Sequence, residues 1–219
     1  LGPNIVPFSA VPKTGETRDS NGPLLASLVK RERGVVTAVE VMNPQKISQI
    51  FSDINNLCEQ SDLVITTGGT FARTRPEGRI FLEKLKAKEL FSGVRLKPGG
   101  HVGAAARDSK LILMLSGNPA ACWVGFELFA VPVLRMMQGL SPLLPRIGAK
   151  CICSFLKQSK VRTFLRGHAA YTDEGWVVEI LPGQKPSMMK SFLGFNALID
   201  LLPNHHPVKV GEEVSEIIL

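Results

Sequence analysis

The chain has 219 residues, of which 44% are hydrophobic and 21% are charged, a balance typical of a soluble globular protein. Lys and Arg (26) outnumber Asp and Glu (19), which suits an anionic ligand. Aromatic residues are not interleaved with the basic ones as base stacking requires, so we expect no nucleic-acid partner. No signal peptide is visible, and Glu127, Pro132 and Arg135 interrupt the apolar stretch 120–137, so we also expect no membrane partner.

The first half of the chain alternates between predicted helices and strands. Residues 1–23 are rich in Pro, Gly, Ser and Thr and are predicted to form a loop. Apolar spacing and short apolar runs then predict, in chain order, a helix at 24–33, a strand at 35–41, a helix at 47–57, a strand at 62–69, a helix at about 77–90, strands at 102–106 and 110–115, and a helix from 119 to about 137. This alternation predicts an α/β fold whose mixed, mostly parallel sheet has helices on both faces.

The composition changes around residues 139–148, which are rich in Pro, Ser and Gly. Beyond them, strand-like runs separated by turn signals occur at 149–156, 163–171, 176–181, 197–202 and 213–219. We therefore predict two domains, an α/β domain at 1–142 and a small, mostly β domain at 146–219. The four cysteines lack the spacing of a disulfide framework, so we expect reduced thiols and a cytoplasmic protein.

The sequence Ser116-Gly117-Asn118-Pro119 lies between a buried strand and a helix. Ser116 and Asn118 can accept hydrogen bonds from the free N–H groups of the helix, and Pro119 suits the first turn. Gly117 lets the backbone approach a ligand closely, and the helix dipole favours an anion there. The same residues could equally form a well-capped helix without a ligand.

A second turn, Thr66-Thr67-Gly68-Gly69-Thr70, also ends a buried strand. Ligands of open α/β sheets bind outside the carboxyl ends of the strands. The two turns are therefore expected to meet in one crevice.

Two further segments place polar groups beside flexible backbone. The sequence KPGGH at 97–101 brings Lys97 next to a turn, although a surface hairpin would look the same. The sequence GETRDSN at 15–21 brings Asp19, Ser20 and Asn21 to the start of a helix, where capping alone could explain them.

Together, the segments GETRDSN, TTGGT, LKPGGH and LSGNPAACWVGFELF resemble the molybdenum-insertion domain of the molybdopterin molybdenumtransferase family. The segments GQKPSMMKSFLGFNALIDLLP and VKVGEEVSEIIL resemble the small β domain that follows it, so the resemblance covers nearly the whole chain. Members of that family use molybdate and adenylylated molybdopterin, with Mg²⁺, and release AMP and molybdenum cofactor. The resemblance therefore implies an anionic pterin or nucleotide ligand and a homodimer.

The resemblance also implies which residues bind. The cleft for the pterin and phosphate would be formed by Gly68, Gly69, Thr70, Ser116, Gly117, Asn118 and Pro119. The nucleotide side would be bordered by Asp19, Ser20 and Asn21, with Asp19 as a Mg²⁺ ligand. Molybdate would be bound by Lys97, Arg166 and Ser187, because a guanidinium with hydroxyl and ammonium donors suits a tetrahedral oxyanion.

The sequence departs from the family pattern at three places. After the Gly-Gly pair the family has VSVGDYD, whose two acidic residues are replaced here by Thr74 and Pro76, so no catalytic residue is assigned. The family's KPGKP turn contains Gly100 and His101 in place of its second Lys and Pro. The family's TGDE corresponds to residues 1–4, so we expect the first strand and the family's N-terminal domains to be missing.

Two hypotheses follow. The chain is an enzyme, or the catalytic half of one, that inserts molybdate into adenylylated molybdopterin. Alternatively, it is a non-catalytic relative that binds molybdopterin or a nucleotide as a carrier, sensor or scaffold. Residues 70–76 distinguish the two hypotheses, because the family's acidic residues are absent there. An acidic residue from elsewhere, such as Glu16 or Glu77, would support the enzyme hypothesis if it took the place of those acids.

Overall fold

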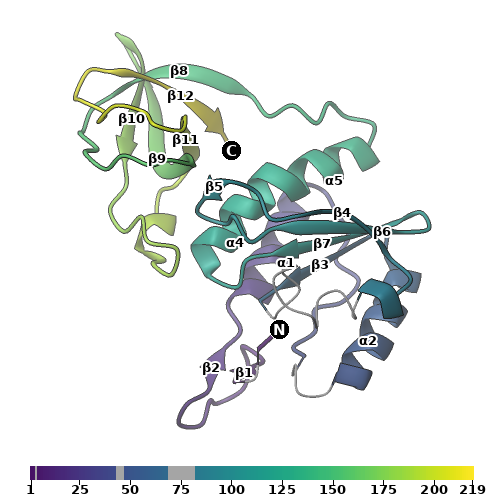
Figure 1. Ribbon diagram of the computed structural model, residues 1–219. Helices are drawn as coiled ribbons and strands as arrows, with labels where there is room; N and C mark the ends of the chain where they lie inside the picture. Colours follow the sequence, from purple (N-terminus) through teal and green to yellow (C-terminus); the bar gives the residue numbers. More distant parts are fainter. Residues whose placement is uncertain (3, 43–46, 69–81) are drawn as a thin grey trace.

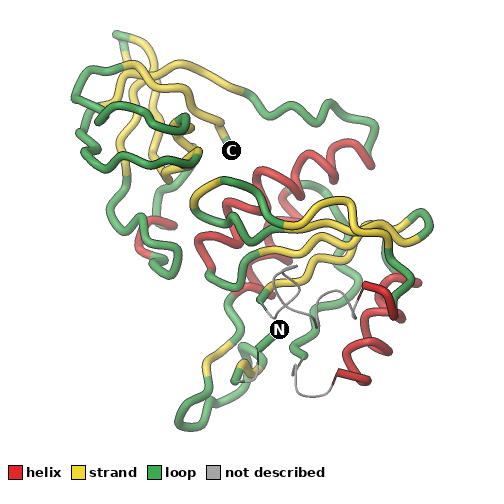
Figure 2. The backbone as a smooth tube through the Cα atoms, in the orientation of Figure 1, coloured by secondary structure: helices red, strands yellow, loops and turns green. Residues whose placement is uncertain are grey.

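The structure is a computed structural model that describes residues 1–2, 4–42, 47–68 and 82–219. Most of its strands gather into two groups (Figures 1 and 2). The first group belongs to an α/β part at the amino-terminal side of the chain, and the second is a β barrel at the carboxy-terminal side. Two short strands, β1 (Ile5–Val6) and β2 (Thr17–Arg18), pair within the predicted loop at 1–23.

The α/β part is built on a four-stranded sheet in the order β3–β7–β6–β4. β3 (Leu63–Thr67) and β7 (Lys110–Leu115) are parallel, whereas β7 with β6 (Gly103–Arg107) and β6 with β4 (Lys88–Ser92) are antiparallel. The prediction of a mixed sheet is confirmed, but the expectation that it is mostly parallel is wrong. The reason is local: Asp108-Ser109 joins β6 to β7 as a tight hairpin, which makes the two strands antiparallel.

Helices pack against this sheet. They are α1 (Asn21–Arg31), α2 (Ile47–Gln60), α4 (Pro119–Gly125), the π-helical segment η1 (Phe126–Ala130) and α5 (Val131–Met137). The last three follow one another without a break and form one helix of 19 residues.

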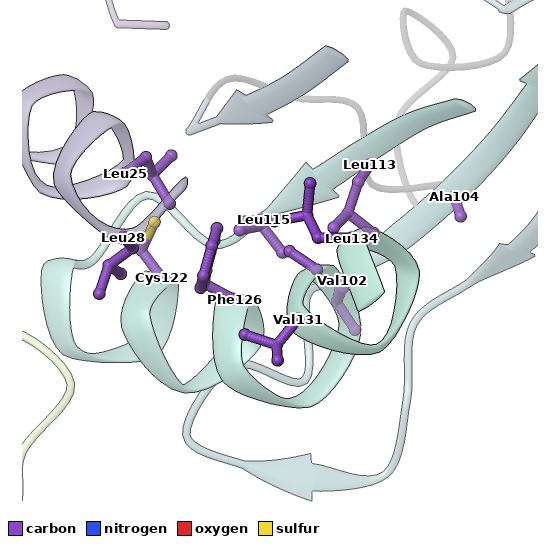
Figure 3. Close-up of a cluster of buried hydrophobic side chains, with 11 residues drawn as sticks. Leu25, Leu28, Val102, Ala104, Leu113, Leu115, Cys122, Phe126, Val131 and Leu134 are labelled. Carbon is purple, nitrogen blue, oxygen red and sulfur yellow. The ribbon is translucent and has the colours of Figure 1, made fainter. Parts of the chain in front are cut away.

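The alternation of side chains along β7 divides the core into two clusters. Leu113 and Leu115 pack with residues of α1, α4, η1 and α5, among them the fully buried Phe126 (Figure 3). Ile112 and Met114 belong to a second cluster, which is completed by α2. The carboxyl end of β7 is thereby held firmly where the candidate site begins.

The helix formed by α4, η1 and α5 is long and apolar enough to cross a membrane, judged by length and composition alone. However, 56% of its most apolar window is buried inside the structure. Cys122, Phe126 and Ala130 recur at four-residue spacing and pack against the sheet. It is a core helix, as the sequence predicts.

Glu127 is not the simple interruption of this helix that the sequence suggested. Its side chain is 1% exposed and accepts hydrogen bonds from Arg31 at 2.9 and 2.7 Å and from the Trp123 indole at 2.6 Å. The Arg31 pair is bidentate, the strongest geometry for a carboxylate. Glu127 therefore joins α1 to the core helix.

The carboxy-terminal part is a closed barrel of five strands. They are β8 (Arg146–Cys151), β9 (Arg162–Thr172), β10 (Gly175–Ile180), β11 (Ala197–Leu201) and β12 (Glu213–Ile218). Their order is β10–β8–β12–β11–β9, and the pairing of β9 with β10 closes the ring. All five strands were predicted from the sequence, although the first, expected at 149–156, begins at Arg146 and ends at Cys151.

The two parts are in contact. β5 (Leu96–Lys97) pairs in parallel with β9, and Leu96 and Val124 share a core cluster with Phe164, Leu198 and Ile217 of the barrel. This contact places one side of the barrel beside the start of the core helix.

Two predicted elements are wrong. Residues 35–41, predicted as a strand, are irregular, because no backbone hydrogen bond joins them to any residue that the structure describes. The helix predicted at 77–90 is wrong at its carboxyl end, where residues 88–90 belong to β4. Residues 77–81 lie outside the described residues.

One ionisable side chain lies in the barrel without a partner. Glu216 is fully buried, and neither carboxyl oxygen has a hydrogen-bond partner among the residues placed in the structure. Burial raises the pKa of Glu216 to about 7. The folded state therefore prefers the protonated carboxyl group.

We predict that Glu216 lowers the free energy of unfolding as the pH rises from 4.5, its ordinary pKa, to about 7. In this range the unfolded chain ionises Glu216 while the folded chain keeps it protonated. Glu216→Gln should remove this loss, stabilising the protein at pH 8 by up to about 3 kcal/mol and changing little at pH 4. Urea denaturation at both pH values measures the effect. Glu213→Gln, exposed on the same strand, is the control, and equal behaviour of the two variants would contradict the prediction.

Candidate functional site

Gly68, which follows β3, and Gly117, which follows β7, meet at one edge of the sheet. A Cβ atom on Gly117 would lie 2.9 Å from the Cα atom of Gly68. Gly68 also has a φ of +66°, and a Cβ atom there would lie 2.5 Å from the Leu1 carbonyl oxygen. Both positions therefore require glycine, and the close approach brings Gly68 at the end of β3 against Gly117 of the SGNP turn.

Asn21 connects α1 to both turns. Its Nδ2 group donates to Thr67 Oγ1 at 3.1 Å and to the Gly117 carbonyl at 2.9 Å. The side chain is only 7% exposed, and its Oδ1 atom has no hydrogen-bond partner in the described part of the chain. One buried amide thus holds three of the predicted motifs together and keeps a free acceptor beside them.

Asp19 and Ser20 stand at the start of α1. Asp19 Oδ1 accepts the backbone N–H groups of Asn21 and Gly22, each at 3.1 Å, and Oδ2 lies 3.2 Å from the same Gly22 nitrogen. Ser20 is exposed and forms no capping hydrogen bond through its side chain. Capping, the alternative that the sequence left open, therefore accounts for the contacts that Asp19 makes.

These contacts limit what Asp19 can do for a metal. Mg²⁺ needs several oxygen ligands, and both Asp19 oxygens already accept N–H groups. Within residues 1–2, 4–42, 47–68 and 82–219, no three His, Cys, Asp or Glu side chains are grouped to hold a metal ion. The described residues alone do not complete a Mg²⁺ site.

The first turn of the core helix is capped by backbone rather than by side chains. Asn118 is exposed and forms no side-chain capping bond, so the expected cap from Asn118 is not formed. Instead, the Ala120 N–H donates to the carbonyl of Pro186 in the barrel at 3.1 Å. Pro119 has no N–H to satisfy. A barrel loop has therefore taken the capping role.

The KPGGH turn packs against the same end of the helix. A Cβ atom on Gly99 would lie 2.9 Å from the Ala121 carbonyl oxygen. The Ser116 hydroxyl donates to the His101 carbonyl at 3.4 Å, so its expected cap is also not formed. Lys97 is exposed and pairs in register with Thr163 of the barrel.

Arg166 is the one fully buried arginine among the residues placed in the structure. Its Nε donates to Ser191 Oγ at 2.6 Å, and its Nη2 donates to the Gly183 carbonyl at 2.8 Å. Nη1 is buried without a partner, and burial lowers the pKa of Arg166 to about 10. Arg166 therefore holds the loop that contains Pro186 while keeping one donor unused.

Ser187 is exposed on this loop, next to Pro186. The sequence did not single out Gln184 and Ser191, although both hold Arg166 in place. Gln184 Oε1 accepts the Arg166 N–H at 3.0 Å, and Gln184 Nε2 donates to the Arg166 carbonyl at 2.8 Å. The signal that could have indicated Gln184 and Ser191 is their place as polar residues in the segment GQKPSMMKSFLGFNALIDLLP, which resembles the family.

Four of the residues discussed for the site lie in the part of the chain that the structure does not describe. Gly69 and Thr70, proposed for the cleft, lie outside the described residues. The same holds for Thr74 and Pro76, which replace the family acids. Of the predicted residues, the structure brings Asn21, Gly68 and Gly117 into direct contact, and it places Lys97 on the strand paired with β9, Arg166 inside the barrel and Ser187 on a barrel loop.

The chain is similar to known proteins over nearly its whole length. Residues 2–136 match the family model described as "Probable molybdopterin binding domain", and residues 149–219 match that of the "MoeA C-terminal region (domain IV)". A molybdopterin molybdenumtransferase of Staphylococcus aureus is 28% identical over 218 residues, which is 99% of this chain and 52% of that protein. The enzyme of the same name from Staphylococcus epidermidis is 28% identical over 205 residues, or 93% of this chain and 49% of that protein.

Solved structures show the same fold. The molybdopterin biosynthesis MoeA protein from Pyrococcus horikoshii superposes with a TM-score of 0.79 at 22% identity, covering 99% of this chain and 52% of that one. A molybdenum cofactor biosynthesis protein from Pyrococcus furiosus gives a TM-score of 0.72 at 22% identity, covering 92% of this chain and 65% of that one. The chain spans about half the length of the curated relatives it matches.

Asn21→Ala tests how far the site depends on the buried amide. We predict that it lowers the free energy of unfolding by about 1–3 kcal/mol, because Thr67 and the Gly117 carbonyl lose their donor in a buried place. Ser20→Ala, at the exposed neighbouring position, should change it by less than about 0.5 kcal/mol. Chemical denaturation measures both, and equal stabilities would contradict this role.

Proposed function

Because the chain belongs to the family of the probable molybdopterin binding domain and carries the MoeA C-terminal region behind it, we propose that it acts in the synthesis of molybdenum cofactor. The proposed reaction inserts molybdate into adenylylated molybdopterin and releases AMP, which makes the protein a transferase. The names of the curated relatives support this reaction class. The observation that carries it is the close approach of Gly68, Gly117 and the KPGGH turn at the start of the core helix.

This meeting point suits the phosphate end of the ligand. The start of the core helix carries partial positive charge from aligned peptide dipoles, and Gly117 and Asn118 are exposed in front of it. Glycine at 68 and 117 leaves the backbone free to lie against the ligand. The unpaired Oδ1 atom of Asn21 adds a buried acceptor that a ligand N–H group could use.

The barrel side of the site suits the oxyanion. Lys97 and Ser187 are exposed, and a tetrahedral oxyanion could accept hydrogen bonds from both. Arg166 is enclosed, so its unpartnered Nη1 would serve the anion only if the loop of Ser187 moved aside. In this proposal Arg166 positions the loop, and Lys97 supplies the accessible charge.

The alternative function, a non-catalytic binder that acts as a carrier, sensor or scaffold, is favoured by one observation. The two acidic positions of the family are Thr74 and Pro76 in this sequence. No residue is assigned as a catalytic acid or base. Ligand binding and AMP release therefore have to be measured separately.

We propose a homodimer, a cytoplasmic location and Mg²⁺ dependence, with Asp19 near the ion. The free state of all four cysteines supports the location. We also propose domains at 1–142 and 146–219, and a sheet covered by helices on both faces, which is supported by the separate packing of β7 residues against α2 and against the core helix.

Calorimetric titration tests ligand binding. We predict that the chain binds adenylylated molybdopterin and that Ser116→Asp weakens the affinity about 3- to 10-fold, because it adds negative charge beside the helix start. Ser109→Asp, at the opposite end of β7, should bind like the parent. Absence of binding by the parent chain would overturn the proposed function.

Release of AMP tests catalysis. We predict that molybdate and Mg²⁺ cause the bound adenylate to be released as AMP. Lys97→Ala should raise the molybdate concentration needed for half-maximal release about tenfold, as expected for one lost charge-assisted hydrogen bond. Lys157→Ala, exposed elsewhere on the surface, is the control. Binding without AMP release would favour the non-catalytic alternative.

A further inference from the structure

Two of the four cysteines lie close together where β8 ends. Cys151 is the last residue of β8, and Cys153 follows it in a bend formed by residues 152 and 153. The Sγ atoms of Cys151 and Cys153 are 3.9 Å apart, and the Cys151 thiol donates to the Cys153 carbonyl oxygen at 3.1 Å. The bend therefore holds the two sulfur atoms near van der Waals contact.

The two thiols differ in how far solvent reaches them. Cys151 is fully buried in the barrel core, and this burial raises the pKa of its thiol to about 11. Cys153 packs at the margin of the same core and is half-buried, and Ile152 between them is 53% exposed. A small reagent from solvent therefore meets Cys153 first, with the protected Cys151 thiol directly behind it.

Strand β10 holds the bend in place. The Ile152 N–H donates to the Val178 carbonyl at 2.9 Å, and the Ile180 N–H donates to Cys153 Sγ at 3.1 Å. In a parallel ladder that continued past β8, the Ile180 N–H would instead bond the Ile152 carbonyl. The Cys153 sulfur thus replaces a backbone acceptor at the end of the β8–β10 pair.

This pair of thiols suits redox chemistry better than metal binding. A structural Zn²⁺ site takes four ligands, and the described part of the chain contains no group of three His, Cys, Asp or Glu residues that could hold a metal ion. A disulfide needs only two thiols whose sulfur atoms can approach each other. The arrangement of Cys151 and Cys153 meets that requirement.

We propose that Cys151 and Cys153 form a dithiol site that a hydroperoxide oxidises to a disulfide within one chain. Cys153 reacts with the peroxide, because it is the accessible thiol, and Cys151 completes the bond from the core side. The other two cysteines, Cys58 and Cys122, are buried in separate clusters of the α/β part and take no part.

The reaction with hydrogen peroxide proceeds in two steps. The Cys153 sulfur attacks one peroxide oxygen, the O–O bond breaks, and water leaves while the sulfur becomes a sulfenic acid. The Cys151 thiol then loses its proton, and its sulfur attacks the sulfenic sulfur, so that the S–S bond forms and hydroxide leaves, taking up that proton as a second water. The peroxide gains the two electrons that the two sulfur atoms lose.

The disulfide would change the end of β10. Bond formation draws the two Sγ atoms from 3.9 Å to about 2.05 Å, which moves Cys153 Sγ away from the Ile180 N–H. The next residue, Leu181, donates its N–H to the Arg166 carbonyl at 3.0 Å, so the change falls beside the contacts that hold Arg166. Because the bond closes a ring over only three residues, we expect low-molecular-weight thiols to reduce it readily.

Peptide mass spectrometry after treatment with one equivalent of hydrogen peroxide tests the site in the parent chain and two variants. The parent should lose two hydrogen atoms from the peptide that contains both cysteines, at unchanged monomer size, and regain them with dithiothreitol. Cys151→Ser should stop at a Cys153 sulfenic acid that dimedone labels, whereas Cys153→Ser should keep Cys151 reduced. Cys58 and Cys122 should stay reduced in all three chains, which serves as the internal control.

Amide hydrogen exchange tests the effect on β10. We expect the Ile180 amide to exchange about tenfold faster in the oxidised parent, as for one weakened hydrogen bond, while strand β11 exchanges equally in both states and so reports an intact barrel. A disulfide that leaves Ile180 exchange unchanged would contradict this effect.

Two results would overturn the site itself. The first is that Cys151 and Cys153 stay reduced in the folded parent at a peroxide dose that oxidises them in urea. The second is that their disulfides join two copies of the chain, which non-reducing electrophoresis would show, because the thiols would then not be paired within the bend.

Discussion

Asn21 places one buried amide where three segments far apart in the sequence have to meet. Its Nδ2 group donates to Thr67 at the end of β3 and to Gly117 after β7, while its own backbone begins α1. The contact is possible because the two facing positions are glycine, which lets the turns approach within van der Waals distance. The shape of the space in front of the core helix therefore depends on the Asn21 amide group and on the lack of a Cβ atom at Gly68 and Gly117.

The barrel depends on this arrangement and contributes to it. Its loop carbonyl at Pro186 accepts the Ala120 N–H at the helix start, and Trp123 packs edge-on against Phe192 and Phe195 with ring centroids 4.6 and 4.9 Å apart. Arg166 fixes the same loop from inside through Ser191 and Gly183. The loop that carries Ser187 is thus anchored both to the start of the core helix and to the inside of the barrel.

The sequence predicted what local pattern determines and missed what distant neighbours determine. The barrel strands, β3, β7 and the core helix follow from hydrophobic periodicity, and the meeting of the two glycine turns follows from their place at strand ends. The missing side-chain cap at Asn118 could not be predicted, because a carbonyl more than sixty residues away replaces it. The burial of Arg166 and the irregular state of residues 35–41 likewise depend on which other segments lie beside them.

We propose that Gly68, Gly117 and the start of the core helix form one ligand site. Titration with molybdopterin tests this when the backbone amide resonances of Gly68, Gly117 and Ala120 are followed by NMR. The three resonances should shift together along one saturable curve, while the amides of the β9–β10 hairpin stay unchanged. Shifts confined to the barrel, or different curves for the three residues, would contradict a single site.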